Sequence, residues 1–207
     1  MKRHPHKMKK TILILFLIFT VNSFSQQSEE YTKFIEEIKH NFKSDKNDKT
    51  VFNLLNDFYE QVLQSDNGEL NQNTLRTIQE LYADHDAKNL QILSMFLAYQ
   101  EHISESFGAG SEPDTTFQLN LLNDLESELD TVYGNIPVII KIYKAEALNS
   151  AGQNQEYGEL LRQSLIEFPN SVPLKVYSYL DTKDEKLKID LIKNHSNHWM
   201  VQQFQIK

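Results

Sequence analysis

Two short stretches contain residue types that could bind a metal ion. His195 and His198 are three residues apart beside Trp199, and residues 84–86 are Asp-His-Asp. Imidazole nitrogens and carboxylate oxygens are common metal ligands, and side chains at i and i+3 share a helix face. Adjacent residues of a helix point apart, however, and neither spacing implies a third ligand. We interpret both stretches as polar turns or helix starts and predict no metal site.

Other catalytic signatures are missing from the sequence or too unspecific to assign. The chain contains no HExxH, GxxxxGK[ST], GxGxxG or GxSxG pattern, and without cysteine it has no thiol nucleophile. Its 29 acidic residues make some carboxylate pair inevitable, so a glycosidase-like pair carries no weight. A serine-based site would need partners that spacing cannot reveal. We expect a protein that is not an enzyme and uses no cofactor.

The first 25 residues have the composition of a secretory signal peptide. Residues 1–10 carry five basic residues and no acid, and residues 11–21 are almost entirely apolar. An 11-residue helix spans about 16 Å, roughly half of a membrane's hydrocarbon core, so an ordinary membrane anchor is not expected. Ser23 and Ser25 favour cleavage after Ser25, which would leave Gln26 as the new N-terminus.

Net charge and cysteine content limit the cellular compartments and the classes of partner that we expect for this protein. Cleavage lowers Lys plus Arg from 21 to 16, leaves Asp plus Glu at 29, and so gives a net charge of −13. Nucleic acid is a poor partner for such an acidic chain, and the acid excess favours solubility. The chain has a predicted signal peptide but no cysteine, so it has no disulfides and no lipid-accepting residue. This combination favours a protein of the bacterial periplasm or the medium. No stable membrane insertion is expected.

Hydrophobic periodicity predicts helices along almost the whole mature chain, and no period-2 strand is convincing. The expected helices cover about residues 31–42, 51–63, 75–82, 87–104, 116–133, 136–150, 155–168, 172–180, 185–193 and 197–205. Residues 26–207 are long enough to bury a core of their own, so we expect one domain. Gly108, Gly110 and Pro113 mark residues 107–114 as a loop and a possible joint between halves.

The second half of the chain resembles itself after a shift of 36 residues. The shift places Pro137 on Pro173 and Tyr143 on Tyr179, with several apolar coincidences around them. Because both prolines mark expected helix starts, the match exceeds what a shared helical period would give. The pattern predicts stacked pairs of antiparallel helices.

Small, apolar and turn-forming residues follow a recognisable order through residues 138–169. They are Ala145, Leu148, Gly152, Leu161, Ser164 and Pro169. Small side chains let two helices approach closely, glycine permits a tight turn, and proline ends a helix. This segment resembles a tetratricopeptide repeat, which implies a TPR-like α-solenoid. The chain departs from the family at Tyr157, where alanine is usual, and at Lys141 and Lys144, where bulky apolar residues are usual.

The resemblance also implies a binding groove, because the first helix of each pair lines the concave face of such a stack. It would place Ile142, Glu146, Asn149 and Ser178 toward that groove, where a partner with basic or amide groups would fit. The aromatic residues of this region, among them Tyr143 and Tyr179, could grip a ligand or simply fill gaps between helices. The repeated register of this pair favours the packing role.

We therefore expect an exported, non-catalytic helical-repeat protein that mediates protein–protein interaction in the cell envelope, as an adaptor or a small complex subunit. One alternative is a ligand-binding or hydrolytic helical domain acting on envelope polysaccharide or nutrient. Another is a toxin-neutralising protein, which would share the fold and differ in its partner.

Overall fold

The computed structural model describes residues 24–207. The predicted signal peptide, residues 1–25, therefore lies outside the described residues apart from its last two positions. The described elements are α1 (Phe24–Asn41), α2 (Thr50–Phe58), the π-helical η2 (Tyr59–Gln64), α3 (Gln72–Ala83), α4 (Leu90–Ala109), α5 (Thr115–Tyr133), α6 (Val138–Ser150), α7 (Asn154–Glu167), α8 (Val172–Thr182), α9 (Glu185–His195) and α10 (Trp199–Gln203). The prediction of an all-α chain of about ten helices is confirmed.

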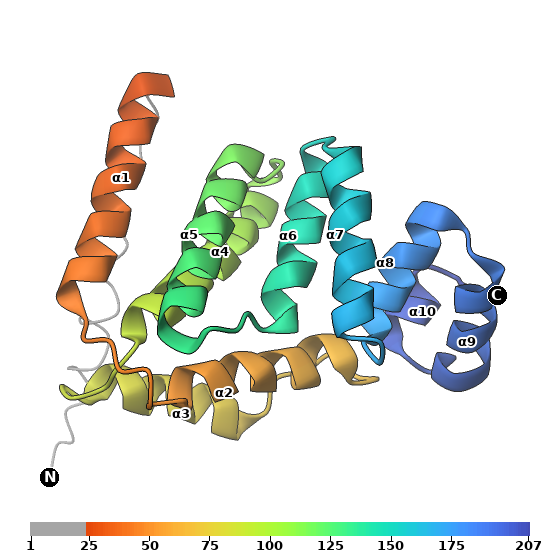
Figure 1. The fold of residues 1–207 in the computed structure, drawn as a ribbon, viewed down its shortest axis with the longest axis horizontal. Coiled ribbons are helices and arrows are strands. Elements are labelled where there is room, and N and C mark those ends of the chain that lie inside the picture. Colours follow the sequence, from red (N-terminus) through yellow and green to blue (C-terminus); the bar gives the residue numbers. More distant parts are fainter. Residues whose placement is uncertain (1–23) are drawn as a thin grey trace, which may run out of the picture. The chain divides into compact units, whose positions relative to one another are not determined.

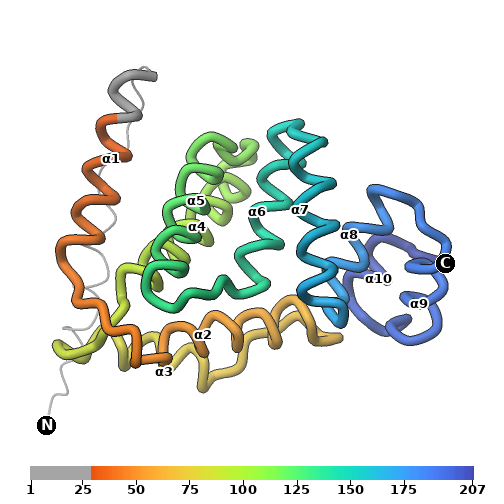
Figure 2. The backbone as a smooth tube through the Cα atoms, in the orientation of Figure 1, coloured from red at the N-terminus to blue at the C-terminus, as the bar shows by residue number. Residues whose placement is uncertain are grey.

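The chain divides within α1, between Glu37 and Ile38, and Ile38–Lys207 forms one compact unit. In this unit each helix from α4 to α9 packs against the next helix in the chain. Figure 1 and the tube in Figure 2 show α4 to α7 side by side, with α2 running across their ends. α2 contacts α4 and α6, and η2 continues along α6 to α8. A segment from early in the chain thus joins helices that follow much later.

The main core lies where α2, α4, α5 and α6 meet. Leucine, isoleucine and aromatic side chains there are fully buried, among them Leu55, Phe96 and Leu125. The Phe96 ring packs edge-on against Phe58 of α2, with 4.9 Å between centroids, and α6 adds Tyr143 to the same cluster. The stripes that the periodicity assigned to separate helices converge on one core.

A smaller core closes the C-terminal end. It consists of Val172, Val176, Leu191, Met200, Val201 and Ile206, which come from α8, α9, α10 and the residues after α10. Tyr177 and Trp199 pack against this cluster. The C-terminal helices are therefore fastened by apolar side chains of their own.

Two predicted helix limits are wrong by several residues. The fourth helix begins at Leu90 rather than near Ala87, because Asn89 adopts a left-handed conformation with φ of 62°. The same helix runs past the predicted end and includes Phe107 and Gly108. It stops at Gly110, which has φ of 66° and closes the helix end by donating to the Phe107 carbonyl. The loop that follows is shorter than residues 107–114.

The predicted second helix changes from an α-helix to a π-helix along its length, and its buried face continues through the change. Its first part is α-helical and its last six residues form η2, while the buried face continues through Phe58, Tyr59 and Leu63. Hydrophobic periodicity indicates which face of a helix is buried, but not which carbonyl accepts from each N–H. It therefore could not distinguish the α-helical part from the π-helical part. The starts marked by Pro137 and Pro173 are confirmed, since these residues open α6 and α8.

Candidate functional site

The described structure has a groove between α5 and α7, with α6 between them, and its volume is about 610 Å³. Its apolar lining consists of Leu119 from α5, Leu148 from α6 and Leu160 from α7. Leu148 is buried, whereas the other two are partly exposed. Leucine at these positions provides a surface that an apolar side chain of a ligand could cover.

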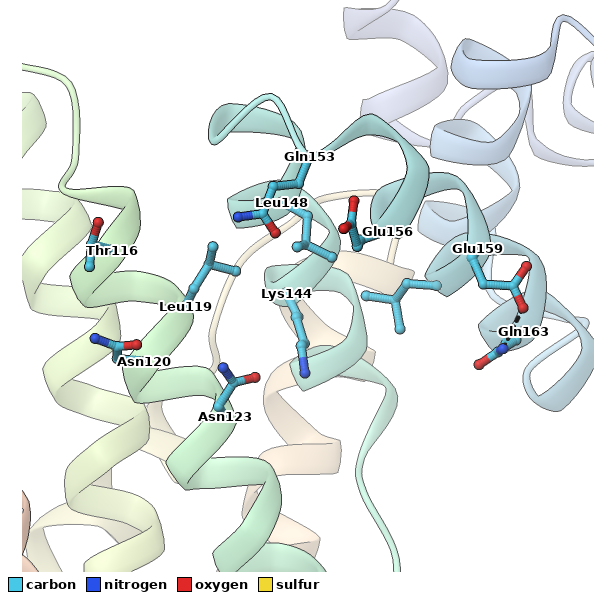
Figure 3. A pocket seen from close by; sticks show the side chains of 11 residues that line it. Thr116, Leu119, Asn120, Asn123, Lys144, Leu148, Gln153, Glu156, Glu159 and Gln163 are labelled. Atoms are coloured by element: carbon cyan, nitrogen blue, oxygen red, sulfur yellow. Dashed lines mark hydrogen bonds between the residues drawn. The ribbon is translucent and has the colours of Figure 1, made fainter.

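Amide side chains border this groove from both sides. Asn120 and Asn123 come from α5, Gln163 comes from α7, and Gln153 precedes α7. Figure 3 shows Asn123 of α5 pointing toward α6, with Gln153 and Gln163 farther across on the α7 side. Asn120 and Asn123 are exposed. Each amide both donates and accepts hydrogen bonds, so the border can pair with either kind of polar group.

Two glutamates add negative charge to the α7 side. Glu156 and Glu159 both line the groove and are exposed. Glu159 accepts hydrogen bonds from Arg162 and Gln163, and the bond from Arg162 is the main cause that lowers the pKa of the Glu159 carboxyl. Both side chains of the Arg162–Glu159 pair are more than half exposed, so water weakens their attraction. The border therefore offers carboxylates as well as amides.

An ion cluster beneath the groove explains the lysines that depart from the repeat pattern. Lys141 and Lys144 of α6 both bond to Glu126 of α5, and the Lys141 Nζ lies 3.0 Å from Oε1. The three side chains are only 14–21% exposed. One carboxylate thus satisfies two lysines where apolar packing would be usual. The sequence alone gives no sign of this pairing, because Glu126 and Lys144 lie on different helices.

The four residues predicted from the repeat geometry lie in different surroundings. Ile142 is fully buried, and Ser178 is buried with a hydroxyl that has no hydrogen-bond partner in the described structure. Asn149 is exposed near the end of α6. Glu146 is partly buried and accepts a hydrogen bond from the Tyr177 hydroxyl of α8. Of the four residues, Glu146 is therefore linked to α8, the helix that carries Ser178, through Tyr177.

The Glu146 carboxylate interacts with several tyrosines of α6, α7 and α8. Burial raises the pKa of its carboxyl above the ordinary value, and the hydrogen bond from Tyr177 works in the opposite direction. Burial, and then the negative charges of Asp181 and Glu146, raise the pKa of Tyr157 to about 12. The Tyr143 ring stacks on Tyr99 of α4, with 5.1 Å between centroids. Tyr143 and Tyr157 are both buried, in agreement with a packing role.

His198 has a structural role at the start of α10. Its Nδ1 accepts a hydrogen bond from the Met200 N–H, and its Nε2 lies 2.9 Å from the Leu63 carbonyl oxygen. A carbonyl can only accept, so Nε2 carries the proton and the imidazole is neutral. Burial is the largest cause that lowers its pKa. The backbone carbonyl of His195 accepts the His198 N–H, but the His195 imidazole has a different contact, with its Nε2 3.9 Å from Asp190.

The Asp-His-Asp stretch forms a turn beside a second, smaller hollow of about 240 Å³. Asp84 and His85 line it together with Phe42 and Leu90, while Asp86 pairs with Lys43 at 3.8 Å. Within residues 24–207, no group of three His, Asp or Glu is placed to hold a metal ion. No helix in the same range is long and apolar enough to cross a membrane.

Comparisons with known proteins give no family assignment. The chain matches no protein-family model, no curated protein and no solved structure.

Sequence reasoning missed the α5–α7 groove. The signal that it could have used is the pair Asn120 and Asn123, two exposed amides on a helix that is otherwise rich in buried leucine. Such a pair shows a polar face but not which helix stands opposite. Only the packing of α6 against both α5 and α7 brings these amides to one groove.

Proposed function

We propose that this chain is an exported, non-catalytic protein that binds a segment of another envelope protein, as an adaptor or a small complex subunit. The observation that carries the proposal is the α5–α7 groove, which combines three leucines with a border of four amides. Leucines offer apolar area, and amides can pair with the backbone of a bound segment.

The segment that fits this groove best is an extended one with basic side chains. An extended peptide presents unpaired N–H and C=O groups, which side-chain amides on both borders can meet. Glu156 and Glu159 would favour Lys or Arg near the α7 border. The mature chain is also acidic overall, which speeds encounter with a basic partner.

We further propose that the fold is a TPR-like α-solenoid. Consecutive helix packing from α4 to α9 supports this proposal. So do details within residues 138–169: Ala145 and Ser164 are buried, and Gly152 has φ of 70° at the turn between α6 and α7. Ion pairing with Glu126 accounts for Lys141 and Lys144, the positions that depart from the repeat.

Export is the third part of the proposal and rests on the composition of residues 1–25. Its test is the N-terminal sequence of the protein recovered from the periplasm or the medium of the source cells. A mature chain that begins at Gln26 supports export through a cleaved signal peptide. Full-length protein confined to the cytoplasm contradicts it.

Binding through the groove is tested with two matched substitutions. Leu160→Ser alters the apolar lining, whereas Ile189→Ser alters a leucine-sized side chain on α9 that is 61% exposed. The full chain, tagged at its C-terminus, is expressed in the source cells and captured from envelope extract at low and high salt. The proposal predicts one stoichiometric partner that Leu160→Ser loses and Ile189→Ser retains, with equal melting temperatures. Equal capture by both variants contradicts the assignment of the groove.

A further inference from the structure

One partly buried carboxylate has no cation to balance it. Glu146 accepts a hydrogen bond from the Tyr177 hydroxyl, and among the described residues no basic side chain pairs with it. A carboxylate removed from water is costly unless it is paired with a positive charge or takes up a proton. Two other partly buried carboxylates of α5 have basic partners: Glu126 is paired with two lysines, and Glu128 lies 3.9 Å from Lys39. Glu146 is therefore the exception in this part of the fold.

Tyrosines from three helices interact with this carboxylate, one of them through a hydrogen bond. Tyr143 lies one turn before Glu146 on α6, Tyr157 comes from α7 and Tyr177 from α8. The Tyr177 hydroxyl donates directly to the carboxylate, and the charge of Glu146 contributes, after burial, to a raised pKa at each of the three tyrosines. The faces of tyrosine rings attract cations, most strongly where water is excluded.

The cluster is accessible from outside and carries a second negative charge at its edge. Glu146 and Tyr177 are each partly exposed, and Phe204, whose ring meets Tyr177 edge-on at 6.3 Å, is 39% exposed. The exposed Asp181 of α8 also acts on Tyr157. The Asp181 carboxylate lies against Gly158 of α7, where an added Cβ would be 3.4 Å from Oδ2.

We propose that Glu146, with the partly exposed ring of Tyr177 beside it, is a recognition site for a guanidinium group. A guanidinium is planar, stacks on aromatic rings and donates hydrogen bonds to carboxylates. It is also less strongly hydrated than an ammonium, so it loses less on leaving water. The bound cation would supply the positive charge that the fold itself does not place beside Glu146.

This site is separate from the α5–α7 groove. Glu146 follows the groove residue Lys144 by two positions, which corresponds to about 200° around the helix. It therefore faces away from the groove, toward α8. The two proposals can fail independently, because a groove substitution does not touch Glu146 and a Glu146 substitution does not touch the groove.

The test is an NMR titration of the purified chain with blocked arginine, N-acetyl-arginine N-methylamide. Blocked citrulline is the control, because it has the same shape and no charge. The site predicts shifts of α6 and α8 signals around residues 146 and 177 with the arginine probe and none with citrulline. Millimolar affinity is expected for one charged group, about −4 kcal/mol by conversion of a 1 mM Kd. Equal shifts from both probes, or no shift from either, would overturn the proposal.

Glu146→Gln and Glu167→Gln form the matched pair of variants. Gln at 146 can still accept the hydrogen bond from Tyr177 but has no charge, so arginine affinity should fall at least about tenfold. Glu167 is exposed on α7, and its substitution should leave the affinity unchanged. Undiminished binding by a folded Glu146→Gln variant contradicts the site.

A measurement on the wild-type chain keeps the proposal testable if that variant does not fold. Binding and protonation compete at Glu146, so the arginine probe should lower the apparent pKa of this carboxyl, followed by carboxyl carbon shifts. The other titratable groups that interact with it are Tyr99, Tyr143, Tyr157 and Tyr177, and Asp181 acts on Tyr157. An unchanged Glu146 titration at saturating probe would exclude a guanidinium there.

A last comparison identifies the source of the guanidinium. A blocked peptide with one central arginine is titrated beside the single blocked residue. Tighter binding of the peptide assigns the site to an arginine of a protein partner. Equal binding assigns it to a small guanidino compound, and both results retain Glu146 as the recognition group.

Discussion

The backbone N–H of Val172 donates a hydrogen bond to the side-chain Oε1 of Gln64, 2.9 Å away and 108 residues earlier in the chain. The same oxygen accepts a hydrogen bond from Tyr59, while the Gln64 Nε2 donates to the Asn170 carbonyl. The side chain of one glutamine at the end of η2 therefore provides hydrogen-bond partners for backbone groups at the beginning of α8. Helix starts carry free N–H groups, and here a distant side chain meets one of them.

Gln64→Ala should destabilise the fold by about 1–2 kcal/mol, because the α8 N–H and the Tyr59 hydroxyl each lose a hydrogen bond. Urea denaturation followed by circular dichroism measures this change. Gln203→Ala, an exposed glutamine at the end of α10, is the control and should leave the midpoint unchanged. Equal midpoints for both variants would show that the Gln64 contacts are dispensable.

Asn89 links the start of α4 to the loop that precedes α2. Its side chain accepts from the Asp45 N–H and donates to the carbonyls of Asp45 and Asp48, while the residue itself is fully buried. Asn89→Ala should cost about 3 kcal/mol, from lost hydrogen bonds and an unfavourable positive φ. Asn89→Gly should cost about 1 kcal/mol less, since glycine tolerates that φ. A glycine variant no more stable than the alanine variant would contradict this account.

Glu126 should be essential only while its two lysines are present. Glu126→Gln leaves Lys141 and Lys144 without a carboxylate in a partly buried place, and we expect a loss of about 2 kcal/mol in the free energy of unfolding. Adding Lys141→Met and Lys144→Met should recover most of that loss, because apolar side chains suit such a position. Additive losses in the triple variant would mean that the lysines act independently of Glu126.

Acidification should destabilise the protein through His198. Its pKa is lowered in the folded state from 6.5, chiefly by burial, so the unfolded chain binds the proton more readily. The stabilisation is complete above about pH 6.5 and is lost as the pH falls toward the folded pKa. His198→Asn can still cap α10 but cannot titrate, so its stability should vary less over this range. The pKa values of His102 and His195 are also lowered, so these residues destabilise the fold in the same way on acidification. Part of the pH dependence of stability should therefore remain in the His198→Asn variant.

Much of the helix pattern was predictable because it depends on local periodicity. The stripe expected over 172–180 corresponds to α8, and the prolines at 137 and 173 mark observed helix starts. Helix ends were less predictable where a distant contact decides them. α4 begins only after Asn89, whose side chain bonds to Asp45 and Asp48, residues more than 40 positions earlier.

The candidate sites depend on which helices stand opposite each other, which periodicity does not encode. Glu146 was expected to face a groove, but its approach to Tyr177 required the placement of α8 beside α6. Likewise, Asn123 and Gln163 gain a shared groove only through the intervening α6. Residue types indicated possible chemistry, and the packing of helices decided which residues met.

The most direct test of partner binding is photocrosslinking in the source cells, with a photoreactive amino acid at Asn123 or at Lys193 of the full chain. Asn123 borders the α5–α7 groove, whereas Lys193 is an exposed residue of α9. The account predicts one discrete protein adduct from position 123 and none from position 193. Identical adducts from both positions, or no adduct from a folded chain at position 123, would contradict the binding of a partner segment in this groove.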